Sequence, residues 1–223
     1  MPDDPELLEC DSDPVEKTGP AKGSDANDDA PVARARAAKV TYKNAVDDVL
    51  ALVSRYACPE ACPQLLLRVE ISEVKVKRGG VSPLGTEYGG SCTWTVTISC
   101  SGRSLAGQTA KRVEDQQLLC DERASGRGSA TGEGAGATKE EAEKKALEDL
   151  QTGLRLALGG SLLAPDDASR FYPRVECPED CPNQKIRIRL DPPSTKCTAP
   201  TKDVDNWKCS AARAWSIRIE CTS

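Results

Sequence analysis

The sequence of 223 residues has no histidine, one phenylalanine, one methionine and only 4% aromatic residues. Without histidine the chain has no Ser-His or Cys-His triad, no His-containing zinc site and no imidazole base acting near neutral pH. No stretch approaches the roughly 18 apolar residues of a membrane span, and Met1 to Val15 lacks the basic and apolar segments of a secretory signal. We therefore expect a soluble chain that is neither a histidine-dependent enzyme nor a membrane protein nor a Sec substrate.

Acidic charge is concentrated at the N-terminus. The first thirty residues contain ten acidic residues, two lysines and four prolines, and Leu7 and Leu8 are almost their only large apolar side chains. Such a segment buries too little surface to offset the entropy of ordering, so we expect a disordered acidic tail over residues 1–38. Removing these residues from the totals of 30 basic and 35 acidic leaves 28 and 25, a formal charge of +3 on the body.

The body contains one pattern twice. Cys-Pro-Glu-x-Cys-Pro occupies residues 58–63 and again 177–182, and each copy leads into an alternating strand pattern and then a tryptophan six residues before a closing cysteine. The matched features are Leu67 with Ile186, Trp94 with Trp215 and Cys100 with Cys221. Three features in the same order indicate an internal duplication. We expect an α+β fold of two related units, each a helix plus an antiparallel β-hairpin.

The periodicities place these elements. Apolar residues at helical spacing predict a helix from Thr41 to about Ala57, and a capping box of Thr138 with Glu141 predicts a second from Thr138 to about Ala157. Period-two alternation predicts strands near 65–71, 92–100, 186–190 and 215–221. The expected organisation is a tail over 1–38, a first unit over 39–137 that ends in a glycine-rich extension, and a second unit over 138–223.

The segment from Gly134 to Leu147, GAGATKEEAEKKAL, resembles the strand-to-helix junction of double-stranded RNA-binding domains. The order of helix, three strands and helix in that family also fits residues 41–157. Lysines at the start of the second helix hold phosphates in the family, so the resemblance implies that Lys139 is a phosphate contact. Glu140 and Glu143 stand at the other two basic positions, where negative charge repels RNA.

The cysteines form groups if each unit is an antiparallel hairpin, because the start of one strand then lies beside the end of the other. The predicted clusters are Cys58, Cys62 and Cys100 in the first unit and Cys177, Cys181 and Cys221 in the second, with Cys197 and Cys209 as a further candidate pair. Disulfides, zinc thiolates completed by Cys120 or Cys197, and buried free thiols are three alternatives. Paired cysteines imply an extracytoplasmic location by a non-Sec route, whereas zinc or free thiols imply the cytoplasm.

No residue pattern predicts a catalytic centre. The chain has neither histidine nor Cys-x-x-Cys to activate a thiolate, and Trp207 is the one aromatic residue that we expect as an exposed binding anchor. We therefore expect a non-enzymatic structural or protein-interaction protein with no cofactor, which binds an unidentified protein or itself and neither nucleic acid nor a membrane. The alternative is a zinc-stabilised module that binds nucleic acid.

Overall fold

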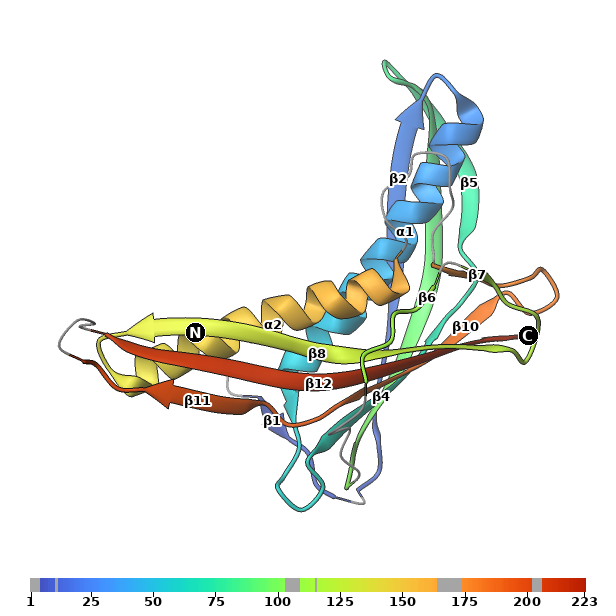
Figure 1. The fold of residues 1–223 in the computed structure, drawn as a ribbon. Helices are drawn as coiled ribbons and strands as arrows, with labels where there is room; N and C mark the ends of the chain where they lie inside the picture. The colour runs from blue at the N-terminus through green and yellow to red at the C-terminus, as the bar shows by residue number, and fades with distance from the viewer. Residues whose placement is uncertain (1–4, 11, 103–108, 115, 164–173, 202–205) are drawn as a thin grey trace.

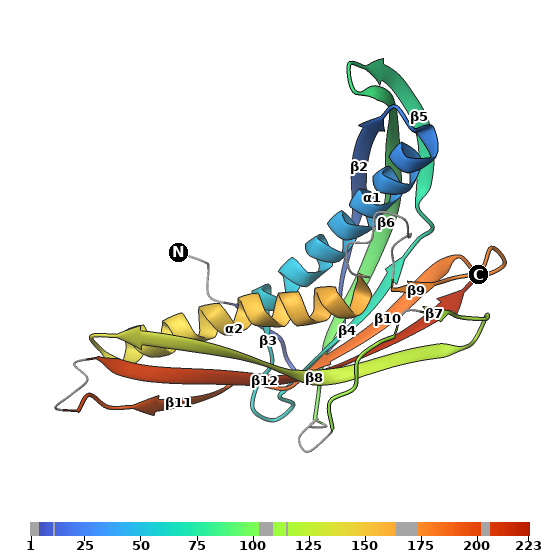
Figure 2. The same ribbon diagram turned by 45° about the horizontal axis from the view of Figure 1, so that its top comes forward.

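The computed structural model describes residues 5–10, 12–102, 109–114, 116–163, 174–201 and 206–223. Two long helices lie on one face of a large, twisted antiparallel sheet (Figures 1 and 2). This arrangement confirms the prediction of an α+β fold.

The order of elements is the same in the two halves of the chain. The first half contains β2 (Val15–Asn27), α1 (Ala30–Leu52), β4 (Gln64–Ile71), β5 (Lys75–Ser82) and β6 (Gly85–Ser101). The second contains β8 (Arg123–Gly136), α2 (Lys139–Leu162), β10 (Asn183–Leu190), β11 (Ser194–Thr198) and β12 (Trp207–Thr222). Short parallel pairs add β1 (Glu6–Leu7) to β3 (Tyr56–Ala57), and β7 (Gln116–Gln117) to β9 (Val175–Glu176). A single turn of 3-10 helix, Val53–Arg55, follows α1.

The two halves meet at the centre of the sheet. Strands β4 and β10 pair antiparallel there, with Arg68 directly opposite Arg187. The long strand β6 pairs with β4, β5 and the edge strand β2, and β12 pairs in the same way with β10, β11 and β8. In both views the halves diverge from this centre, and α1 and α2 approach each other at their C-terminal ends (Figures 1 and 2).

The prediction of a disordered tail over residues 1–38 is wrong for the described part of this segment. Residues 15–27 form β2, which pairs with β6 along its full length, and α1 begins at Ala30 rather than Thr41. Asp29 caps this helix by accepting the backbone N–H of Val32 at 3.3 Å. Residues 1–4 and 11 lie outside the described residues.

This prediction failed because β2 contributes small residues and backbone hydrogen bonds rather than large apolar side chains. Ala21 is buried, and a Cβ atom added at Gly23 would lie 2.8 Å from Cγ1 of Val40 on α1. The first turns of α1 bury only alanines, Ala33, Ala37 and Ala38, against this strand. Small residues here allow the helix to approach the sheet closely.

The glycine-rich segment belongs to the second half, which differs from the expected boundary at residues 137 and 138. It forms β8, which pairs with β12 from Arg123 opposite Glu220 to Gly136 opposite Trp207. A Cβ atom added at Gly128 would lie 2.9 Å from Cζ2 of Trp215, so the glycine makes room for the indole. The corresponding position in the first half is Gly19, which faces Trp94.

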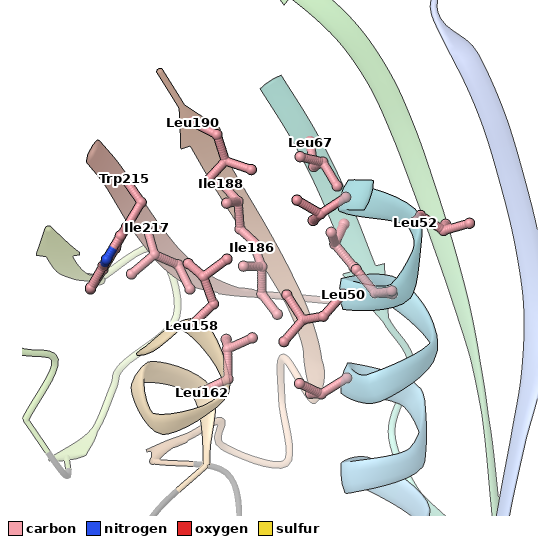
Figure 3. Packing of buried hydrophobic residues seen from close by; sticks show 14 of the residues in the cluster. Leu50, Leu52, Leu67, Leu158, Leu162, Ile186, Ile188, Leu190, Trp215 and Ile217 are labelled. Carbon is pink, nitrogen blue, oxygen red and sulfur yellow. The ribbon is translucent and has the colours of Figure 1, made fainter. Parts of the chain in front are cut away.

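Apolar residues from both helices and both central strands form one core (Figure 3). Leu50 of α1, Leu158 and Leu162 of α2, and Ile186 of β10 are buried and point towards one another. Buried hydrogen bonds also join the halves. The Tyr42 hydroxyl donates to Gln184 Oε1 at 2.6 Å, and Gln64 Nε2 donates to Asp191 Oδ1 at 3.0 Å. Because an unpaired buried polar group is costly, these bonds favour one relative placement of the halves.

Candidate functional site

Ten of the eleven cysteines form five disulfides, which confirms the disulfide interpretation. The pairs are Cys10–Cys62, Cys58–Cys100, Cys120–Cys181, Cys177–Cys221 and Cys197–Cys209. Every pair lies within one half. Four of them span 42 to 61 residues, and closing loops of this size in the unfolded chain stabilises the fold by about 4 kcal/mol per bond.

Cys62 and Cys181 do not bond to the closing cysteines beside which they were expected. Cys58 and Cys177 bond to the closing cysteines instead, while Cys62 pairs with Cys10 and Cys181 with Cys120. The parallel pairs β1–β3 and β7–β9 bring the preceding segment beside each Cys-x3-Cys corner. Strands β1 and β7 are only two residues long, which is too short for a period-two pattern to reveal them.

The chemistry left to the cysteines is limited. A disulfide sulfur is not the thiolate that zinc requires, and within the described ranges no group of three or more His, Cys, Asp or Glu residues is placed to hold a metal ion. The remaining cysteine, Cys92, is buried, and burial raises the pKa of its thiol to about 11. The Cys92 thiol is therefore protonated at neutral pH and is a poor nucleophile.

Lys139 and Trp207 are the other two residues that the sequence predicted to contact a partner. Lys139 is exposed in the first turn of α2, beside Glu140 and Glu141. Trp207 is half-buried and packs against the core opposite Gly136 in register, so only part of its indole is exposed, and its role as a binding anchor stays a prediction. None of the described helices is long and apolar enough to cross a membrane.

The face of the sheet opposite the helices carries a concentration of cations on β4, β10, β12 and β8. Outward side chains that are neighbours in register form two adjacent rows, here called the arginine rows. The first row contains Arg68, Arg187 and Arg218, and the second contains Arg189, Ser216, Arg127 and Lys111. Arg127 is oriented by a hydrogen bond from its Nε to the carbonyl of Thr109 at 2.5 Å.

A hollow of about 350 Å³ lies over these rows. Its described lining contains Lys111, Arg127, Arg187, Arg189 and Arg218, together with serines, and includes no carboxylate. The carboxylate of Glu220 lies 3.1 Å from Arg123 Nε and 3.5 Å from one nitrogen of Arg187. Among the described residues, five cations therefore line the hollow, and the carboxylate paired with one of them is shared with Arg123.

The next row of the same face has an ordinary charge pattern. Read across β4, β10, β12 and β8, it contains Glu70, Lys185, Glu220 and Arg123, so its signs alternate. Opposite charges across a sheet stabilise it, whereas like charges directly opposite each other destabilise it. Arg187 lies opposite Arg68 on one side and Arg218 on the other. The like-charged neighbours in the arginine rows thus oppose folding, and the ion pair of Arg187 with Glu220 offsets part of this cost.

Most of the other arginines in these rows have no basic counterpart in the first half, in which Arg68 matches Arg187 and Glu70 matches Arg189. The counterpart of Arg218 is Thr97, because each lies three residues after the tryptophan of its half, Trp215 or Trp94. Arg127 precedes the glycine beneath Trp215, and Thr18 precedes the glycine beneath Trp94. Threonine therefore occupies the same strand positions without disrupting the sheet, which means that the fold does not require arginine there.

The sequence contained part of this signal, since Lys185, Arg187 and Arg189 alternate with the apolar residues of β10. Sequence reasoning missed the site because only the pairing of β10 with β4 and β12 brings Arg68 and Arg218 beside them.

Comparisons with known proteins assign no family. No family model matches the chain, and no curated protein matches it. A crystal structure of a hypothetical protein from Francisella tularensis is similar over 89% of this chain and 83% of that one, at 10% identity and a TM-score of 0.19. A likeness at this level shows neither a shared fold nor a shared function.

Proposed function

We propose that this protein is a non-enzymatic binding protein, stapled by disulfides, that holds an anionic partner on the arginine rows. One observation carries the proposal. Two adjacent rows of outward side chains present six cations, and no carboxylate lines the described hollow above them. Guanidinium groups donate paired hydrogen bonds to carboxylate, sulfate or phosphate, so such a surface is suited to oxyanions.

Binding is favoured over catalysis by the composition of the hollow. Its described lining offers cations and two serine hydroxyls, Ser125 and Ser216, with neither a carboxylate nor an imidazole to act as a general base. An activated serine needs such a partner within hydrogen-bonding distance.

The disulfides support a location in an oxidising compartment. Five bonds in 223 residues persist where thiols are not kept reduced. We therefore place this binding function outside the cytosol.

We also infer that the two halves are copies of one ancestral unit. The order of elements, the disulfides Cys58–Cys100 and Cys177–Cys221, and the antiparallel contact of β4 with β10 support this inference. In such a duplication Arg68 and Arg187 are the shared cations, whereas Arg127 and Arg218 of the second copy are matched by Thr18 and Thr97 in the first, and Arg189 is matched by Glu70.

The test is a titration with dextran sulfate at increasing NaCl concentration, followed by fluorescence anisotropy. The chain has a net charge of −5, which opposes non-specific attraction to a polyanion. Wild type is expected to bind at low salt, and Arg218→Thr to bind more weakly with a salt slope reduced by about one. Arg123→Thr, which removes an arginine already paired with Glu220, is the matched control. Absence of binding by the wild type, or equal loss in both variants, would refute the proposal.

A further inference from the structure

The arginine rows continue into a second hollow. This hollow, of about 430 Å³, lies beyond β8 towards α2 and shares Lys111 and Arg127 with the first. It adds the exposed cation Arg112, and again no carboxylate belongs to its described lining. Arg174 also lines this hollow, but its guanidinium is engaged with the end of α2, where it donates to the carbonyls of Gly160 at 2.9 Å and Leu163 at 3.3 Å. The cationic surface is therefore continuous around the edge of the sheet.

The dimensions of this surface exceed those of a single oxyanion. From Arg68 on β4, the path crosses β10, β12 and β8 to Lys111, which is bridged to Arg127. Four interstrand spacings of about 4.8 Å give a path of roughly 19 Å before the second hollow begins. A ligand that contacts all these cations must be a chain with several negative groups along its length.

The lining of the two hollows does not favour a folded protein or a single-stranded nucleic acid. Protein interfaces centre on apolar and aromatic anchors, and the described lining of the first hollow contains only one large apolar residue, Ile217, which is buried. Single-stranded nucleic acids stack their bases on aromatic side chains. The aromatic residue at the second hollow, Trp215, is 7% exposed and lies beneath Gly128. Leu156 is the exposed apolar side chain there.

Hydroxyl groups accompany the cations instead. Ser125 and Ser216 line the first hollow and Ser129 lines the second. Serine hydroxyls both donate and accept hydrogen bonds, which matches the hydroxyls of a sugar ring, while guanidinium groups match its sulfate or carboxylate substituents. Basic patches that bind sulfated polysaccharides have this charge character.

We propose that the partner of the arginine rows is a linear acidic polysaccharide, which runs across β10 and β12 and around the edge of β8 into the second hollow. This inference rests on the binding function proposed above and names the class of its ligand. The compartment supports the choice, because disulfide-bonded proteins occur where polysaccharides are abundant and nucleic acids are scarce.

The experiment compares anionic polymers of matched charge against the complete, oxidised protein. The probes are a sulfated oligosaccharide series derived from heparin, oligogalacturonate, oligothymidylate, a DNA duplex and poly-L-glutamate, each measured at the same ionic strength. An oligosaccharide long enough to reach both hollows is expected to bind at least about tenfold more tightly than poly-L-glutamate or oligothymidylate, which corresponds to 1.4 kcal/mol. Comparison of the heparin and galacturonate series identifies sulfate or carboxylate as the preferred group.

The length series tests the path. Arg112→Ser, in the second hollow only, is expected to abolish the advantage of long oligosaccharides while leaving short ones unaffected, whereas Arg218→Thr weakens both. Equal or tighter binding of oligothymidylate or the duplex would assign the site to nucleic acid, and equal binding of poly-L-glutamate would assign it to acidic proteins; either result overturns the polysaccharide inference alone. Failure of every probe to bind at low salt overturns the proposed function as well.

Discussion

Replacing Arg218 with threonine should stabilise the unliganded protein while weakening its binding of anions. Arg218 lies directly opposite Arg187 in register, and Arg187 also faces Arg68. Two unit charges 4 Å apart repel by about 1 kcal/mol in water, and a like-charged pair across a sheet costs roughly 0.2–1 kcal/mol. For a chain of this size the relief corresponds to a rise in melting temperature of about 1–3 °C.

Salt dependence identifies the cause of this gain. Screening shortens the Debye length from about 10 Å at 0.1 M salt to about 3 Å at 1 M, so an electrostatic gain shrinks as NaCl is added. A gain in stability that came from the β-propensity of threonine would stay the same as NaCl is added. The assay is thermal unfolding of the wild type and the variant at 0.05, 0.15 and 1 M NaCl, without ligand.

The control is Arg123→Thr, because Arg123 is on the same face but is paired with Glu220 at 3.1 Å. Its removal loses an attraction, so the melting temperature is expected to stay constant or fall. If Arg218→Thr lowers stability, or if its gain is the same at all salt concentrations, the arginine rows are not a repulsive cluster and the reasoning fails.

Three further predictions concern the framework of the site. Gly128→Ala should destabilise the protein by about 1–3 kcal/mol, because the added methyl group meets Trp215. The control in thermal unfolding is Gly89→Ala, because nothing lies within 4 Å of the methyl group added there. Equal melting temperatures for the two variants would contradict the packing of Gly128 against Trp215. Titration with a thiol reagent should find no reactive thiol in the native protein, one after unfolding and eleven after reduction, and a second thiol in the unreduced protein would contradict the disulfide assignment. The free energy of unfolding should fall as pH rises from 9 towards 11, because the pKa of the Cys92 thiol is 9 in the unfolded chain and about 11 in the folded protein. Urea unfolding at pH 7.5 and 10.5 should show that wild type loses about 2 kcal/mol more than Cys92→Ala over this range. Equal losses in the two proteins would show that Cys92 is not responsible.

The parts of the fold with local signals could be predicted from the sequence. The start of α2 is an example, because Thr138 accepts the N–H of Glu141 at 3.2 Å and the Glu141 carboxylate accepts the N–H of Ala137 at 3.1 Å. These contacts span four residues, so the spacing alone reveals them. The alternating strands β6, β10 and β12 were visible for the same reason, since each buries its own large apolar residues on one face.

The parts that depend on distant neighbours could not be predicted. Strands β2 and β8 contribute glycine and alanine to the inner face of the sheet, and their burial comes from the helices above them. The pairing of Cys10 with Cys62 depends on the two-residue strand β1. The arginine rows depend on the central pairing of β4 with β10, which no local pattern specifies.

The central claim, that the arginine rows hold an anionic chain, is tested most directly by arginine footprinting. The oxidised protein is treated with phenylglyoxal in the presence and absence of a heparin-derived oligosaccharide, and the modified arginines are identified by peptide mass spectrometry. The account predicts that the oligosaccharide protects Arg187 and Arg218 and leaves the exposed Arg34 and Arg36 of α1 unprotected, because α1 lies on the opposite face. Protection of Arg34 and Arg36 without protection of Arg187 and Arg218 would contradict it.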